Sequence, residues 1–166
     1  MLFSPMYIMM VGLPGSGKST MVTKLVHPAK YQLLSTDAYI TMWADQQGLT
    51  YNEGFKSLIG PAQENFYAEL KDALFSHANI VHDQTNLTVK KRASILSKIP
   101  NYYYKVACVV TCSERERQIR LGNRPGKVIP VDVDKQMIES FIEPTLSEGF
   151  HHVQNVHTSS TFNSIW

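Results

Sequence analysis

Short apolar runs alternate along the chain with longer stretches in which apolar residues recur at helical spacing. An apolar run of four to eight residues is typical of a strand buried on both faces, whereas a period of about 3.6 residues indicates a helix packed on one side. The runs predict strands near Met6–Val11, Tyr31–Ser35, Asn79–Asp83, Tyr104–Cys112 and His152–His157. The periodic stretches predict helices over Lys18–His27, Asp37–Gln47, Tyr51–His77, Val89–Ser97 and Ser113–Leu121. This alternation predicts an α/β fold, a parallel sheet flanked by helices.

Three further features concern breaks and packing in this pattern. Gly60 and Pro61 are expected to interrupt the third helix, and residues 122–126 read as a mobile loop because glycine and proline punctuate them. A last helix should follow Pro130 and pack back on the core. The apolar residues expected on its inner face are Val133, Met137, Ile138, Phe141 and Ile142.

Length and composition limit the range of functions. A chain of 166 residues suits one α/β domain, here expected to span 1–166, and its net charge of +2 neither requires nor excludes nucleic acid as a partner. Cys108 and Cys112 lack the spacing of a zinc site and are expected to be reduced thiols. No segment approaches the roughly 18 apolar residues of a membrane span. We expect a cytoplasmic protein with no membrane association and no obligate protein partner.

The strongest motif lies at the junction between the first predicted strand and the first predicted helix. Residues 12–19, GLPGSGKS, match the phosphate-binding pattern GxxxxGK[ST] in full. Such a loop turns successive backbone N–H groups towards one point, its lysine approaches the β- and γ-phosphates, and its serine hydroxyl binds Mg²⁺. ATP and Mg²⁺ are the expected ligands; a glycine-rich turn without a ligand is the alternative. The expected nucleotide contacts are Gly12, Pro14, Gly15, Ser16, Gly17, Lys18, Ser19 and Thr20.

A phosphate-binding loop does not by itself distinguish a kinase from a GTPase or a motor ATPase. Residues 45–48 fit the loose DxxG pattern of GTPases, but they lie in a helical stretch and no NKxD motif exists to read guanine. A motor ATPase would couple the site to another domain, for which the expected single domain leaves no room. A small ATP-dependent phosphotransferase is therefore favoured.

Two carboxylates follow predicted strands and are candidates for the chemistry. Asp37 opens the helix after the second strand, where a general base for an acceptor hydroxyl is needed; a simple preference for the helix N-terminus explains its position equally well. Asp83 closes the third strand and is expected, with Ser19, to hold Mg²⁺. A turn-forming role is the alternative for Asp83.

Basic residues are densest on the fifth helix and the loop after it. Arg115 and Arg117 alternate with glutamates, which predicts a solvated, salt-bridged face. Arg120 and Arg124 lie where that helix ends, and they are expected to close over the nucleotide as part of a helical lid over about residues 113–130. Plain surface charge is the alternative.

Aromatic residues follow the candidate base. They either stack on a nucleobase or pack between helices, and the pattern leaves both readings open. They are Tyr39, Trp43, Tyr51 and Phe55.

Together these segments resemble the kinase domain of polynucleotide 5′-hydroxyl kinases, such as the bacteriophage end-healing enzymes. The similar stretches are 12–20 (GLPGSGKST), 35–39 (STDAY), 83–87 (DQTNL) and 120–130 (RLGNRPGKVIP). The resemblance implies a sheet of strand order 2-3-1-4-5 and transfer of the ATP γ-phosphate to the 5′-hydroxyl of DNA or RNA. It also implies that Asp37 is the general base, that Arg124 reaches the transferred phosphoryl group beside Arg120, and that Tyr39 and Asn86 contact the acceptor. For a phage protein, the host cytoplasm would be its location.

One departure from that family concerns the acceptor. The end-healing enzymes carry, three residues after the base, an arginine that grips the acceptor's phosphate, whereas this chain has Ile40, which cannot pair with a phosphate. Basic residues available instead are Lys56, Lys90, Lys91 and Arg92. The chain is also similar to 5-hydroxymethyluracil DNA kinases, which modify a base within DNA and would not need such a grip. Phosphorylation of 5-hydroxymethyluracil in DNA and phosphorylation of a small molecule (nucleoside or sugar) remain alternative activities.

Overall fold

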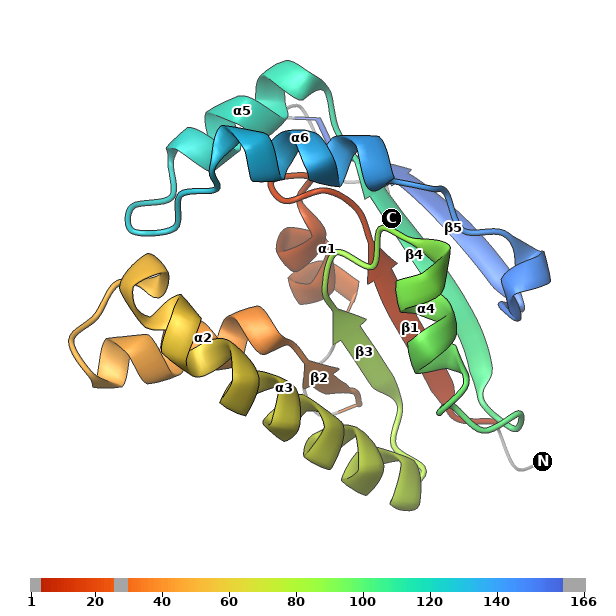
Figure 1. Ribbon diagram of the computed structural model, residues 1–166. Helices are drawn as coiled ribbons and strands as arrows, with labels where there is room; N and C mark the ends of the chain where they lie inside the picture. The colour runs from red at the N-terminus through yellow and green to blue at the C-terminus, as the bar shows by residue number, and fades with distance from the viewer. Residues whose placement is uncertain (1–3, 26–29, 160–166) are drawn as a thin grey trace.

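The computed structural model describes residues 4–25 and 30–159, and its centre is a five-stranded sheet (Figure 1). The strands are β1 (Met6–Val11), β2 (Gln32–Leu34), β3 (Ile80–Asp83), β4 (Tyr104–Thr111) and β5 (His152–His157). Every neighbouring pair is parallel and the spatial order is β2-β3-β1-β4-β5. Both the α/β class and the strand order are thus confirmed.

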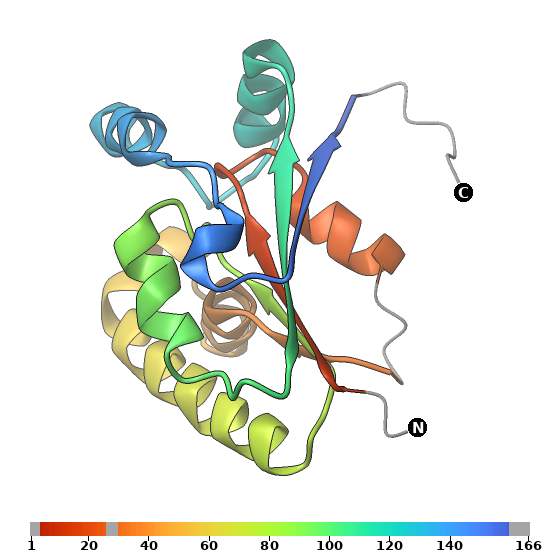
Figure 2. The same ribbon diagram turned by 90° about the vertical axis from the view of Figure 1, so that its right-hand side faces the viewer.

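Helices cover both faces of the sheet and the carboxyl end of its strands. They are α1 (Lys18–Leu25), α2 (Thr36–Gln46), α3 (Tyr51–Phe75), α4 (Val89–Leu96), α5 (Glu114–Gly122), α6 (Val131–Ser140) and the short 3₁₀ helix η1 (Leu146–Glu148). Helices α3 and α4 lie on one face and α1 on the other, while α5 and α6 lie beyond the strand ends (Figure 2). The predicted end of the first helix, at 26–27, is outside the described residues.

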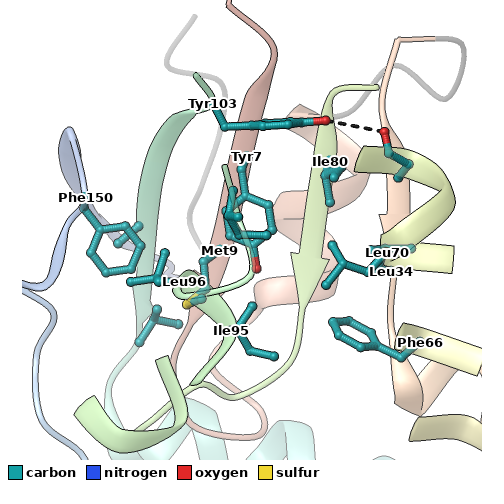
Figure 3. Packing of buried hydrophobic residues seen from close by; sticks show 14 of the residues in the cluster. Tyr7, Met9, Leu34, Phe66, Leu70, Ile80, Ile95, Leu96, Tyr103 and Phe150 are labelled. Carbon is teal, nitrogen blue, oxygen red and sulfur yellow. Dashed lines mark hydrogen bonds between the residues drawn. The ribbon is translucent and has the colours of Figure 1, made fainter. Parts of the chain in front are cut away.

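The core has one layer on each face of β1, because successive side chains of a strand point to opposite sides. Tyr7 and Met9 face the larger layer, where Phe66 of α3 and Ile95 of α4 pack around them (Figure 3). Met10 faces the smaller layer beneath α1. Burial on both faces explains why these strands are apolar without alternation.

Helix α3 continues through Pro61, so the predicted interruption is wrong. Proline usually ends a helix before it because its ring clashes with the preceding Cβ, and Gly60 has no Cβ. The buried side of the helix also continues across the proline, since Gly54 before it and Ala62 and Phe66 after it are all buried. Tertiary packing on both sides of Pro61 therefore outweighs the hydrogen bond that proline cannot make.

Helix α6 does not pack on the core as expected, because it lies beyond the strand ends rather than against a face of the sheet (Figure 2). None of its residues is buried, Val131 is 82% exposed, and the helix ends before Phe141. Phe141 packs against the larger core layer, whereas Ile142 is exposed. None of the helices within residues 4–25 and 30–159 has the length and apolar character to cross a membrane.

Candidate functional site

The glycine-rich loop joins β1 to α1 and is wedged between neighbouring strand ends. At Gly12 the backbone has φ +152°, and a Cβ there would lie 2.3 Å from the carbonyl oxygen of Val110 in β4. The Gly12 N–H donates to the Thr85 carbonyl just after β3, at 3.0 Å. Only glycine fits this position, so the loop has the tight, strand-bound form expected of a phosphate cradle.

Lys18 begins α1 and folds back over this loop. Its Nζ donates to the carbonyl oxygens of Gly12 and Leu13 at 2.8 and 2.9 Å, and the residue is 9% exposed. Burial lowers the pKa of Lys18 to about 8, although the charges of Asp83 and Asp37 oppose the shift. An ammonium carries three donors, so one remains to meet a phosphate beside the loop.

Ser19 and Asp83 meet at the same edge of the sheet. The Ser19 hydroxyl donates to Asp83 Oδ2 at 3.2 Å. Burial raises the pKa of Asp83, and the charge of Lys18 partly offsets this. A hydroxyl and one carboxylate fit Mg²⁺, which is commonly held by one or two carboxylates plus the substrate's phosphates. Among the described residues no group of three or more His, Cys, Asp or Glu forms a cage of its own for a metal.

Arg120 and Arg124 line a cavity of about 350 Å³ next to the loop, formed with Thr20 and Met21 of α1. The Arg120 guanidinium donates to the carbonyl oxygens of Gly15 and Ser16 at 3.3 and 3.1 Å. It also donates to the hydroxyl of Thr158, after β5, at 2.9 Å. The structure thus brings both predicted arginines next to the glycine-rich loop.

The prediction of a solvated charged face on α5 is wrong for Arg117, which is buried. It is 2% exposed and forms two-point contacts with Glu114 at 2.8 and 2.9 Å and with Asp134 of α6 at 2.7 Å twice. Hydrogen bonds to both carboxylates raise the pKa of Arg117. The ion pair with Asp134 therefore joins α6 to α5, which the alternating Glu-Arg pattern did not indicate.

Asp37 lies at the start of α2, where the Ser35 hydroxyl caps the helix by accepting from the Ala38 N–H at 3.3 Å. Its side chain is 59% exposed. Oδ1 accepts a hydrogen bond from the Tyr51 hydroxyl at 2.8 Å, and Oδ2 one from Lys127 Nζ at 2.7 Å. Burial raises the pKa of this carboxyl, but the charge and hydrogen bond of Lys127 and the hydroxyl of Tyr51 lower it further, so the net shift is downward.

Asn86 and Tyr39, the residues that the resemblance implies as acceptor contacts, lie in different surroundings. Asn86 is fully buried and its amide donates to the Met10 carbonyl at 2.8 Å, so its side chain is engaged within the fold, and a substrate contact by Asn86 stays a prediction. Tyr39 packs between α2 and α3, with its hydroxyl donating to Glu69 Oε2 at 2.6 Å and its ring stacked on Trp43. A substrate contact by Tyr39 stays a prediction.

Arg92, one of the basic residues considered for binding the acceptor's phosphate, and Ile40 both lie in the interior. Arg92 is fully buried, pairs with Glu148 at 2.7 and 2.9 Å and donates to three backbone carbonyls, so it is not available to a nucleic acid strand. Ile40 is also fully buried. Lys56, Lys90 and Lys91 are exposed. Sequence reasoning also missed the pairing of Lys127 with Asp37, across 90 residues.

Comparison with known structures agrees with this geometry. A putative kinase from Chloroflexus aurantiacus has 18% identity and a TM-score of 0.71, with 98% of this chain and 88% of that chain covered. A chain of the Pnkp1/Rnl/Hen1 RNA repair complex has 18% identity and a TM-score of 0.65, covering 84% of this chain and 45% of that one. A gluconokinase from Sinorhizobium meliloti has 20% identity and a TM-score of 0.57, covering 93% and 83%.

At these identities the structures share the fold with this chain, a P-loop kinase fold. A family model described as an AAA domain, AAA_33, matches residues 7–144, which is most of the chain. The protein therefore belongs to the AAA_33 family of P-loop proteins.

Proposed function

We propose that this protein transfers the γ-phosphate of ATP to a hydroxyl on nucleic acid, in the first place the 5′-hydroxyl end of a polynucleotide. The observation that carries the proposal is the position of Asp37. Its exposed carboxylate lies close enough to Lys18 for the two charges to influence each other's pKa. A candidate base thus faces a candidate phosphate site.

On the donor side, the loop's N–H groups and the ammonium of Lys18 bind the β- and γ-phosphates. Ser19 and Asp83 would hold Mg²⁺, which supplies charge neutralisation on the transferred phosphoryl group. Within the described residues Arg124 is hydrogen-bonded only through its backbone carbonyl, which accepts from the Lys127 N–H at 3.2 Å, so its guanidinium is free to contact the transferred group. Arg120 orders the loop by binding its carbonyls.

On the acceptor side, Asp37 orients the hydroxyl and accepts its proton as the oxygen attacks the γ-phosphorus. In a parallel α/β sheet, ligands bind outside the carboxyl ends of the strands, and the donor and acceptor groups all lie at that edge. The resemblance of residues 35–39 and 83–87 to end-healing kinases supports a polynucleotide acceptor. Similarity to a chain of an RNA repair complex agrees with it.

A second candidate is an acceptor without a strand-end phosphate. It is favoured by Ile40, whose burial leaves no basic side chain at the position where end-healing kinases carry one. The acceptor would then be the hydroxymethyl group of 5-hydroxymethyluracil in DNA, or a small molecule of the kind a gluconokinase uses.

The test offers γ-labelled ATP with three acceptors: a 5′-hydroxyl oligonucleotide, a 5′-blocked duplex with internal 5-hydroxymethyluracil, and gluconate. We expect label on the first, with a rate that falls steeply as salt rises because strand binding releases counterions. Label on the blocked duplex or on gluconate alone, with no label on the free 5′-end, would overturn the proposal.

A further inference from the structure

The carboxylate of Asp37 is engaged at both oxygens. Oδ1 holds the Tyr51 hydroxyl and Oδ2 holds Lys127, 2.8 and 2.7 Å away. A neutral hydroxyl leaves the carboxylate negative and still able to accept further hydrogen bonds. An ammonium ion neutralises it and makes it a poorer proton acceptor. In this arrangement, therefore, Lys127 restrains the group that the proposed reaction needs as a base.

Lys127 is held in place by the backbone on either side of it. Asn52, at the start of α3, donates its N–H to the Gly126 carbonyl at 3.0 Å. Its side chain exchanges two hydrogen bonds of 2.8 Å with the backbone of Val128. The Lys127 ammonium also lies 4.0 Å from the centre of the Tyr51 ring, and its side chain is 24% exposed. The pairing with Asp37 is thus built into the docked loop, and it differs from a chance contact of a mobile surface lysine.

An acceptor must compete with this ion pair to reach Asp37. A neutral alcohol offers the ammonium no replacement partner, so releasing it from the carboxylate carries a desolvation and charge cost. A phosphate next to the attacking hydroxyl offers a charge-assisted hydrogen bond of comparable strength. The exchange then leaves the ammonium paired and the carboxylate free.

We propose that Lys127 is a latch on Asp37 which an anionic acceptor releases: the acceptor's phosphate takes Lys127 from the carboxylate, and Asp37 then accepts the proton of the neighbouring hydroxyl. This inference rests on the proposed function and names the acceptor class as alcohols that carry a phosphate beside the hydroxyl. The acceptor oxygen bonds to the γ-phosphorus as the β–γ bridging bond breaks and ADP leaves. The proton passes to Asp37 and then to water, and Lys127 stays protonated throughout. The latch would also supply the phosphate contact that Ile40 cannot make.

The test compares two acceptors that differ only by a phosphate, a nucleoside 3′-phosphate and the same nucleoside, through their values of kcat/KM. We expect the wild-type protein to favour the phosphorylated acceptor by at least about 10-fold, because only that acceptor gains a hydrogen bond between charged groups. Lys127→Gln should lower kcat/KM for that acceptor by about 10- to 100-fold, the range for one lost hydrogen bond to a charged group. The same change should raise kcat/KM for the nucleoside, because the base is no longer restrained.

Two further variants show whether charge at this place is what matters. Lys127→Arg should retain most of the preference, and Lys135→Gln, on the exposed surface of α6, should retain all of it. A preference unchanged in Lys127→Gln, or loss of activity on both acceptors to the same degree, overturns the inference while leaving the proposed function standing. Wild-type transfer to neither acceptor nor to a 5′-hydroxyl oligonucleotide overturns the proposed function and the latch together.

Discussion

The two carboxylates that bind Arg117 differ sharply in exposure, and this difference gives a quantitative prediction. The Asp134 side chain is 13% exposed and that of Glu114 is 60% exposed, while both lie at hydrogen-bond distance from the same buried guanidinium. We expect Asp134→Asn to destabilise the protein far more than Glu114→Gln, because water replaces the lost charge only at Glu114.

The expected losses of unfolding free energy follow from the burial of each carboxylate. Removing one member of a buried ion pair costs about 3–5 kcal/mol, and Asp134 belongs at the lower end of that range because part of it still meets solvent. An exposed pair is worth under about 1 kcal/mol, which sets the limit for Glu114. For a chain of this size, about 3 kcal/mol corresponds to a fall in Tm of roughly 6–12 °C.

The measurement is urea unfolding at pH 7, followed by far-UV circular dichroism and extrapolated linearly to water. Nucleotide affinity measured alongside should fall in Asp134→Asn, because α5 also carries Arg120 to the glycine-rich loop. Equal losses of unfolding free energy in the two variants, or a greater loss in Glu114→Gln, would refute the argument from exposure.

Two further predictions concern the backbone and acid stability. Gly12→Ala should abolish nucleotide binding in a titration with an ATP analogue, since the new Cβ would lie 2.3 Å from the Val110 carbonyl oxygen. Gly122 in α5 has open space around it, so Gly122→Ala should instead raise the free energy of unfolding by about 0.5 kcal/mol. Burial raises the pKa of Glu148, but the hydrogen bonds and charge of Arg92 outweigh it and the net pKa is lowered. Stability from this pair is present above the unfolded pKa of about 4.3 and is lost as pH falls below it, so the unfolding free energy of Glu148→Gln should vary less between pH 5 and pH 3 than that of the wild-type protein.

Local patterns were sufficient to predict the main elements of the fold. Apolar runs located β1, β3 and β4, since burial on both faces leaves a nearly continuous apolar signal, and the glycine-rich motif located the β1–α1 junction. The continuity of α3 was missed because Pro61 is a strong breaker on its own. Its accommodation depends on Gly60 before it and on core contacts after it.

The site was predicted less completely, because part of it depends on contacts between residues far apart in sequence. Asp37 and Asp83 follow strands, and strand ends meet at one edge of a parallel sheet, so their position was accessible. The pairing of Lys127 with Asp37 spans 90 residues and that of Arg117 with Asp134 spans 17. No local pattern records either, and the Glu-Arg alternation on α5 suggested solvation instead. The hydrogen bond from the Asn86 amide to the Met10 carbonyl likewise joins residues far apart in sequence and was not indicated by its motif.

The role of Asp37 as the base for phosphate transfer from ATP can be tested by comparing its variant with a matched carboxylate variant. Label transfer from ATP to a 5′-hydroxyl oligonucleotide is measured for the wild-type protein, for Asp37→Asn and for Asp45→Asn, an exposed carboxylate on the same helix. We expect Asp37→Asn to lower kcat by about 10²- to 10⁴-fold, the usual contribution of a general base, while its affinity for ATP stays near the wild-type value and Asp45→Asn behaves as wild type. Wild-type turnover by Asp37→Asn would contradict this role.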